Sequence, residues 1–312
     1  MSDIRFELRT VANDPYDSLK TLDTKYVSYG IDSLDQALNG LESRTVTVIT
    51  GRPSEGKSTF VHNVILNAVN TSKKVLLIDG EHNRNDLYNN LFRKVIGGDR
   101  TLYDEITCFK KVRKEPKPLV LEKLTKWFGN KLMMAFNYEM EVDGFDSMFS
   151  VMARYCKGSK IDLVVLDNLM SLVYSSQAEI NSKQSDFMKR CVKLAKAENV
   201  AIMLVAHPNK GAPKGKEIDY YSISGTADIP NLMDNAIQII KDPTDDDGGI
   251  ICDGMAVVLK NRKYSEYPKI EMAFDKSTMG LCEIVNGQIK GKKYDWRQEG
   301  KQEWIQNDTI PF

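Results

Sequence analysis

Residues 51–59 read GRPSEGKST and connect an apolar run, VTVIT (46–50), to a segment with helical periodicity, FVHNVILNAV (60–69). The spacing G-x-x-x-x-G-K-S at a strand-to-helix junction is that of a P-loop. Gly51 and Gly56 allow the backbone to curl so that successive N–H groups point inward and hold phosphates. The sequence therefore predicts a site for ATP or another nucleoside triphosphate.

Two side chains of this loop carry the expected chemistry. Lys57 would reach the β- and γ-phosphates, and Ser58 would hold Mg²⁺. The helix that follows adds the positive end of its dipole. The predicted nucleotide-binding residues of the loop are Gly51, Arg52, Pro53, Ser54, Glu55, Gly56, Lys57, Ser58 and Thr59.

Composition narrows the class of protein. The chain has 312 residues, and its 43 lysines and arginines balance its 43 aspartates and glutamates. The five cysteines lack C-x-x-C spacing, which argues against a zinc site or a disulfide framework and for a reducing compartment. No run approaches ~18 apolar residues. We therefore expect a soluble, cytoplasmic protein, in host cytoplasm if it is phage-encoded.

Buried strands alternate with helical patterns along the chain, which predicts an α/β fold with a mostly parallel sheet. The last two strands flank the polar turn DPTDDDGG (242–249) and predict an antiparallel hairpin at the edge of the sheet. The predicted strands are TVTVIT (45–50), KVLLID (74–79), IDLVVLD (161–167), VAIMLVAH (200–207), NAIQII (235–240) and MAVVLKN (255–261).

Polar residues at the ends of these strands are the candidate catalytic groups. Asp167 would hold Mg²⁺ at the carboxyl edge of the sheet, with an N-cap role as the alternative. Glu81 would activate the attacking water; Asp79 competes for this role, and a solvated glutamate is the alternative. His207 would sense the γ-phosphate, although a lone histidine at a strand end is more often a packing residue.

Basic residues form two further groups. Lys210, Lys214 and Lys216 follow His207 in a loop with glycine and proline, which suits a nucleic-acid backbone or is a solvated loop. Lys260 and Arg262 leave one face of a strand end, where Arg262 is either an arginine finger for a neighbouring subunit or part of an exposed basic pair. A third stretch, FKKVRKEPKP (109–118), is interpreted as solvated surface.

Taken in order, these motifs resemble the ATPase domain of DnaB-like hexameric replicative helicases, including phage and Twinkle-type members. The resemblance runs from SYGIDSLDQALNGL (28–41) to AFDKSTMGL (273–281). It implies a RecA-like fold, a ring of subunits, Mg²⁺ with a nucleotide, and movement on single-stranded DNA. The implied site residues are catalytic Glu81, γ-phosphate sensor His207, arginine finger Arg262 with its partner Lys260, base-stacking Phe274, and DNA-binding Lys210, Lys214 and Lys216.

Both ends of the chain differ from the centre. We expect a subunit-docking arm over residues 1–27, a RecA-like ATPase domain over 28–288, and a flexible polar tail over 289–312, with neither a fused primase nor a helical N-terminal collar. The tip NDTIPF resembles the docking peptide of bacterial single-stranded-DNA-binding proteins, with a frayed terminus as the alternative. Its candidate contacts with replisome partners are Asp308, Ile310, Pro311 and Phe312.

The sequence thus favours a ring-forming, nucleotide-driven replicative DNA helicase that works with a separate primase or polymerase. Two alternatives stay open: a RecA/RadA-type recombinase or KaiC-like ATPase, which would share the P-loop, and a P-loop switch that recruits replication partners through its tail.

Overall fold

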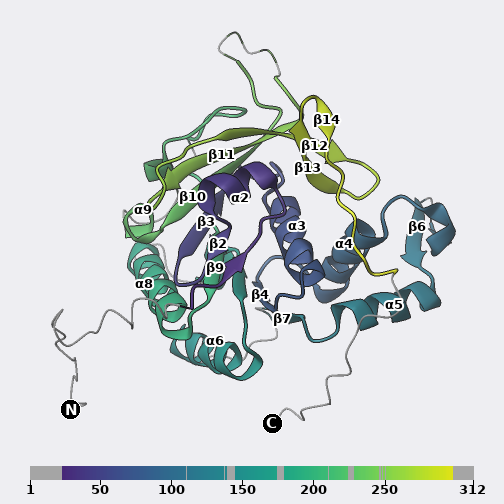
Figure 1. The fold of residues 1–312 in the computed structure, drawn as a ribbon, viewed down its shortest axis with the longest axis horizontal. Coiled ribbons are helices and arrows are strands. Elements are labelled where there is room, and N and C mark those ends of the chain that lie inside the picture. The colour runs from purple at the N-terminus through teal and green to yellow at the C-terminus, as the bar shows by residue number, and fades with distance from the viewer. Residues whose placement is uncertain are drawn as a thin grey trace.

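A computed structural model describes residues 23–297 except 110, 137, 139–144, 174–178, 210, 224–227, 246, 248 and 250. Its centre is a ten-stranded sheet with the order β14-β13-β12-β11-β10-β3-β9-β8-β4-β7 (Figure 1). The α/β prediction with a mostly parallel sheet is confirmed. In the described part of the chain, no helix is long and apolar enough to cross a membrane.

Six neighbouring strands of this sheet are parallel, so their carboxyl ends meet at one edge. Five of them are almost completely buried, which explains their continuous apolar runs in the sequence, whereas β7 is half-buried along most of its length. The parallel strands are β10 (Asn235–Lys241), β3 (Val46–Thr50), β9 (Ala201–Val205), β8 (Leu163–Asp167), β4 (Val75–Asp79) and β7 (Leu132–Phe136).

An antiparallel extension continues the sheet beyond β10. The expected hairpin forms, but it does not end the sheet, because three more strands follow β11. In β12 buried and exposed residues mostly alternate. Such a strand has no continuous apolar run and is harder to recognise in the sequence than a strand covered on both faces. The extension comprises β11 (Gly254–Asn261), β12 (Lys269–Asp275), β13 (Gly280–Val285) and β14 (Gln288–Ile289).

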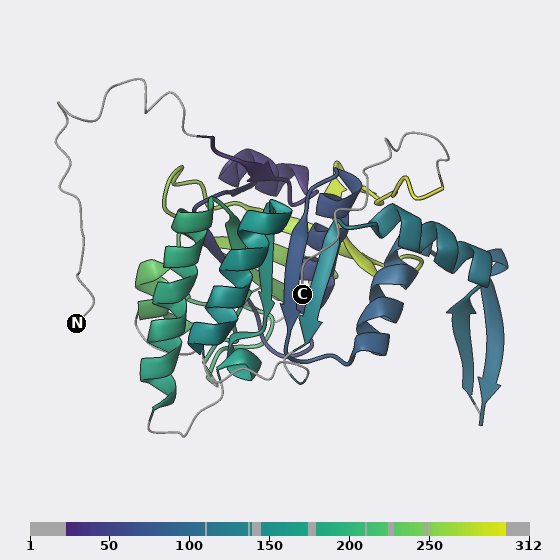
Figure 2. The same cartoon turned by 90° about the horizontal axis from the view of Figure 1, so that it is seen from below.

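Helices cover both faces of the sheet and create two apolar cores, to which successive strand residues point alternately. In Figure 2, α6 and α8 lie side by side over one face. One core packs against α2 (Asp32–Leu38), α3 (Lys57–Asn70), α4 (Arg84–Ile96) and α5 (Pro118–Phe128). The other packs against α6 (Phe145–Ser159), α7 (Leu169–Leu172), α8 (Ile180–Glu198) and α9 (Asp228–Leu232).

Six small elements complete the described structure. β1 (Tyr26–Val27) pairs with β2 (Leu41–Glu42). A separate hairpin of β5 (Tyr103–Cys108) and β6 (Lys111–Pro116) projects from the body between α4 and α5 (Figure 2). The short 3₁₀ helices are η1 (Arg100–Leu102) and η3 (Tyr220–Ser222).

The described part of the expected tail, up to Arg297, differs from a free peptide. Trp296 is buried in the first core, and Tyr294 packs against it. The indole Nε1 of Trp127 in α5 donates to Asp295 Oδ1 at 2.6 Å. Isolated aromatic residues in a polar sequence show no helical or strand periodicity, so the sequence did not predict that Tyr294 packs against Trp127 of α5.

Candidate functional site

The P-loop connects the carboxyl end of β3 to the first turn of α3, which begins at Lys57. Gly51 has φ +149°, and a Cβ there would lie 2.4 Å from the carbonyl oxygen of Ile239, so no larger residue fits. Gly56 has φ +94°, a backbone conformation that side chains other than glycine rarely adopt. The loop therefore has the curled backbone that the spacing predicts.

Lys57 lies inside this loop and is buried. Its Nζ donates to the Arg52 carbonyl oxygen at 2.8 Å. Burial lowers the pKa of Lys57, while the nearby carboxylates of Glu55, Glu81 and Asp167 act in the opposite direction. The ammonium is thus aimed at the loop's interior, where a phosphate would be its natural partner.

Two aspartates stand side by side at the carboxyl edge, because Asp79 ending β4 is in register with Asp167 ending β8. Both are buried, but only Asp79 is satisfied: it accepts from the backbone N–H groups of Glu81 and His82 and from His82 Nδ1 at 2.9 Å. Among the described residues, neither oxygen of Asp167 accepts a hydrogen bond. Burial raises the pKa of Asp167 to about 6, with Asp79 and Glu81 adding to the shift.

A buried carboxylate with two unpaired oxygens fits a divalent cation. Ser58 lies close enough to Asp167 to oppose the rise in the pKa of Asp167. The two predicted metal-binding residues are therefore neighbours in the structure. Within the described ranges, no group of three or more histidines, cysteines or carboxylates could hold a metal. Mg²⁺ keeps several waters and binds one or two protein oxygens plus phosphates, which suits this sparse donor set.

Glu81, Asn168 and His207 come together beside the P-loop from three different strand ends. Asn168 Nδ2 donates to Glu81 Oε1 and lies 3.3 Å from His207 Nε2. His207 Nε2 is 3.8 Å from Glu81 Oε1, beyond hydrogen-bond range. The nearby imidazole is still the main reason that the pKa of Glu81 lies below its usual value. Glu81 is thus kept ionised, as a general base requires.

Sequence reasoning missed Asn168 and His82. Asn168 caps α7, since its Oδ1 accepts from the N–H groups of Met170 and Ser171. The residue that caps the helix after β8 is therefore Asn168 and not Asp167. His82 hydrogen-bonds Asp79, which raises the pKa of His82. No sequence pattern pointed to that pair.

The basic loop after β9 crosses over the P-loop. Arg52 Nη1 donates to the Ala212 carbonyl oxygen at 2.8 Å. The base of the loop is fixed by buried Gln238 of β10, whose side chain bonds the Ile218 N–H and the Lys216 carbonyl, each at 3.0 Å. Lys214 and Lys216 are exposed on this loop.

Arg262 lies at the opposite edge of the sheet. Asn235 pairs with Thr47 near the start of β3 and also with Asn261 of β11. Arg262, the residue after Asn261, therefore lies near the amino end of β3. The P-loop follows the other end of that strand, about 10 Å away along its axis at ~3.3 Å per residue. The arginine finger candidate therefore does not share an edge with its own P-loop.

Several contacts hold Arg262 and Lys260 in place. Arg262 Nη1 donates to Asp234 Oδ1 at 3.0 Å, while the other oxygen of Asp234 accepts from the Val46 N–H at 2.9 Å. Lys260 Nζ donates to the Pro230 carbonyl oxygen at 2.6 Å and lies 5.7 Å from the centre of the Tyr220 ring. Lys260 thus contacts the segment that follows the basic loop.

Phe274 is on the P-loop side of the antiparallel extension. It is 38% exposed and pairs in register with Leu281. A Cβ on Gly56 would contact the Leu281 side chain at 3.4 Å, which places this strand pair beside the P-loop. A half-exposed ring there is available to stack on a base.

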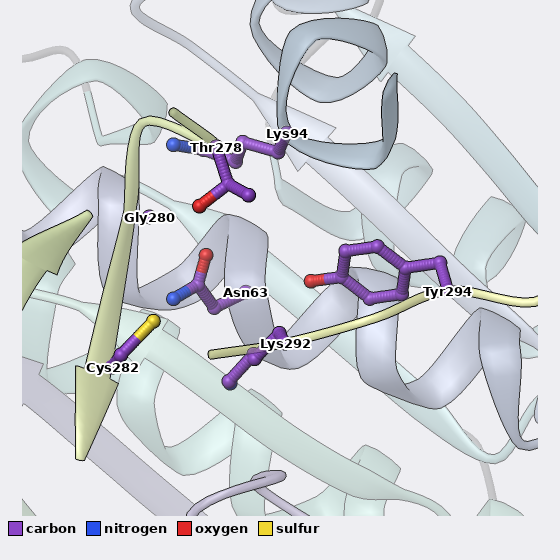
Figure 3. A pocket seen from close by; sticks show the side chains of 7 residues that line it. All are labelled: Asn63, Lys94, Thr278, Gly280, Cys282, Lys292 and Tyr294. Atoms are coloured by element: carbon purple, nitrogen blue, oxygen red, sulfur yellow. The ribbon is translucent and has the colours of Figure 1, made fainter. Parts of the chain in front are cut away.

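A narrow pocket lies behind this region, between α3, α4 and the segment after β14 (Figure 3). Lys94 Nζ donates there to the Met279 carbonyl oxygen, and Lys292 Nζ has no hydrogen-bond partner among the described residues. Burial lowers the pKa of both lysines to about 8. None of the predicted nucleotide ligands lines this pocket, so it is structurally separate from the P-loop.

Some predicted residues lie outside the part that the structure describes. They are Lys210, residues 1–22 of the expected arm, and Asp308, Ile310, Pro311 and Phe312 of the tail tip.

The chain is similar to known proteins in both sequence and fold. A family model described as the DnaB-like helicase C terminal domain matches residues 27–218. No curated protein sequence matches the chain. One similar solved structure is "The Structure Of A DnaB-Like Replicative Helicase And Its Interactions With Primase", with a TM-score of 0.63, 16% identity and coverage of 85% of this chain. A second is the "ATPase Domain of G40P", with the same three values.

The lengths of these relatives differ. The alignment covers 64% of the first solved chain and 94% of the second, so this chain spans less than two thirds of the first. At this identity the two structures establish the fold, which is RecA-like.

Proposed function

Because the chain belongs to the DnaB-like helicase family, we propose that it is the motor of a replicative DNA helicase that forms a ring and couples nucleotide hydrolysis to movement on single-stranded DNA and duplex unwinding. One observation carries the proposal: the P-loop with Glu81 lies at one edge of the sheet, while Arg262 lies at the other. A complete hydrolytic site then needs two subunits, which a closed ring supplies at every interface.

Within one subunit, the residues at the carboxyl edge would bind and orient the reactants. Lys57 and the loop N–H groups hold the phosphates, and Ser58 with Asp167 would hold Mg²⁺, which offsets developing phosphoryl charge. Glu81 accepts the proton of the attacking water, and Asn168 holds Glu81 toward His207. Phe274 stacks on the base of the nucleotide.

Arg262 of a neighbouring subunit would complete the site. An arginine that meets developing charge on the transferred phosphoryl group contributes ~10³–10⁵ in rate. Asp234 holds the guanidinium by one nitrogen, while Asn231 accepts from the other at 2.5 Å. Arginine has five N–H donors, so further donors stay available for a phosphate. Lys260 supports the same surface.

DNA contact would come from the loop after His207. The strand end at His207 continues into Pro208, which bridges to Ile223 across the base of the loop. A shift of His207 on γ-phosphate release would therefore move the segment that carries Lys210, Lys214 and Lys216. Lysines in such a loop bind phosphates without reading bases.

The partners of the ring are proposed by analogy. One matched structure describes a DnaB-like replicative helicase and its interactions with primase. We infer a hexamer that works with a separate primase and other replisome proteins, and the tail tip Asp308, Ile310, Pro311 and Phe312 is a candidate docking peptide.

A strand-displacement assay on a forked duplex, with each nucleotide tested, checks this function. Lys57→Ala should abolish nucleotide binding and unwinding. Glu81→Gln should bind Mg²⁺–nucleotide normally but lose hydrolysis and unwinding, because the proton acceptor is gone. Glu122→Gln, on an exposed pair with Lys126, is the matched control and should keep full activity. Unwinding by Glu81→Gln at the rate of the unchanged protein would contradict the assignment.

A further inference from the structure

The hairpin of β5 and β6 has no place in the site described above. Its two strands pair with each other in a separate two-stranded sheet. Cys108 pairs with Lys111, and Phe109 directly follows the first strand at the turn. Phe109 is fully exposed at this tip. Figure 2 shows the hairpin extending away from the body.

The base of the hairpin is fixed on the core. Tyr103 Oη donates to the Gly97 carbonyl oxygen at 3.0 Å, and the Lys117 N–H donates to the Leu102 carbonyl at 3.0 Å. Leu102 and Tyr103 also pack against the first apolar core. The tip is therefore presented by an anchored arm.

Charge is concentrated toward the tip. Residues 109–114 read FKKVRK and contain four basic residues and no acidic residue, whereas the whole chain has zero net charge. Of the acidic residues of the first strand, Asp104 pairs with Glu115 near the base, and Glu105 pairs with Lys114. Such a basic tip attracts a polyanion.

The arrangement of apolar side chains does not form a protein-docking face. Ile106 and Val112 are both exposed. Val112 pairs with Thr107, the neighbour of Ile106, so Ile106 and Val112 point to opposite faces of the hairpin. A helix or strand of a partner would need its apolar contacts on one face. Phe109 is thus an exposed ring in a basic stretch of the sequence.

The backbone at the tip adds to this picture. Phe109 has φ +52°, in the left-handed region where a two-residue hairpin turn favours asparagine or glycine. A bulky aromatic there carries a steric cost. The ring therefore does not serve the turn itself.

We propose that this hairpin tip binds unpaired nucleotides of single-stranded nucleic acid, with the exposed Phe109 ring stacked on a base, in a stretch whose sequence is rich in lysine and arginine. Aromatic stacking on bases is tolerant of sequence, and basic side chains beside it follow the backbone. The contact lies on a different element from the basic loop after His207 and does not depend on hydrolysis.

Binding of labelled 30-mer oligodeoxythymidine and oligouridine to the full chain tests the proposal, with the two probes separating DNA from RNA. Phe109→Asn suits the turn and should still weaken binding of at least one probe about five-fold or more, because stacking is lost. Phe109→Trp should retain affinity, and its added tryptophan fluorescence should be quenched by the bound strand. Leu119→Ala, an exposed apolar residue on α5, is the matched control and should bind normally.

The same measurement in a Lys57→Ala background separates this contact from the motor function. If Lys57→Ala abolishes hydrolysis but Phe109→Asn still weakens oligonucleotide binding by the same factor, the hairpin contact is independent of the motor function. Equal affinity of Phe109→Asn and the unchanged protein for both probes, with no quenching in Phe109→Trp, would overturn the proposal and favour a protein partner at the tip.

Discussion

At the scale of residues, the two aspartates at the carboxyl edge predict opposite stability effects. Asp167→Asn removes a buried charge with unpaired oxygens and should stabilise the nucleotide-free protein by about 1–3 kcal/mol. Asp79→Asn removes an acceptor that serves three donors and should destabilise it by about 1 kcal/mol. Urea unfolding at pH 7 with a chelator measures both. Shifts of the same sign would contradict this account of the edge.

Asp167→Asn should also lose function. If Asp167 holds Mg²⁺, the stabilised variant should gain no further stability from Mg²⁺–nucleotide and should not hydrolyse it. A gain in stability together with a loss of activity is the pattern expected of a charge retained for its ligand.

Lys292 predicts a pH-dependent stability. Its folded pKa is about 8 against an ordinary value of 10.5, so between these pH values the unfolded chain holds more protons and stability rises with pH. Lys292→Met should therefore be more stable at pH 7 by about 1–3 kcal/mol, and its advantage should shrink by pH 10. Urea unfolding at both pH values measures this. Lys293→Met, at an exposed neighbour, is the control. An equal gain in stability of Lys292→Met at both pH values would contradict the buried charge of Lys292 as its cause.

Residues that follow buried strands could be predicted from the sequence, and residues defined by tertiary contacts could not. Asp167 ends β8, and Glu81 and His207 follow the ends of β4 and β9; the order of these strands in a parallel sheet brings their carboxyl ends together. Asn168 and Asp234 act through contacts with segments far along the chain: Asn168 reaches Glu81, and Asp234 joins Val46 to Arg262. No local spacing records those contacts.

At the scale of elements, Gln238 connects the nucleotide strand to the basic loop. Gln238 is buried in β10, in register with Thr50 just before the P-loop, and its amide holds the base of the loop by two hydrogen bonds. Gln238→Leu should leave the Ile218 N–H and the Lys216 carbonyl without these bonds and loosen the loop. We expect basal hydrolysis to persist and stimulation by single-stranded DNA to fall about five-fold.

Hydrolysis measured with and without oligodeoxythymidine gives that ratio. Gln184→Leu is the matched control, because Gln184 is equally buried but lies in α8. Equal stimulation in Gln238→Leu and the control would show that the loop does not depend on this amide.

Elements differ in how well the sequence predicts them. The six strands with continuous apolar runs were predicted, because burial on both faces leaves a clear signal. The hairpin of β5 and β6 was missed: its strands are largely exposed, and the run FKKVRKEPKP (109–118) was interpreted as solvated surface. β7 was also missed; it reads LMMAF and is half-buried along most of its length.

At the scale of the whole molecule, the central claim is that each subunit carries two halves of different sites. The P-loop and Glu81 lie at the carboxyl edge of the sheet, and Arg262 lies at the amino edge. The distance between the two edges is a property of the register, which the spacing of residues in the sequence does not give.

Mixing two inactive variants tests this claim most directly. Lys57→Ala lacks a working P-loop and keeps Arg262, whereas Arg262→Ala lacks the finger and keeps the P-loop. In rings formed at random from equal amounts, about a quarter of the interfaces would join an intact P-loop to an intact arginine. We predict that hydrolysis in the mixture rises well above the mean of the separate variants, toward about a quarter of the unchanged protein's rate. A mixture no more active than that mean would contradict a site shared between subunits.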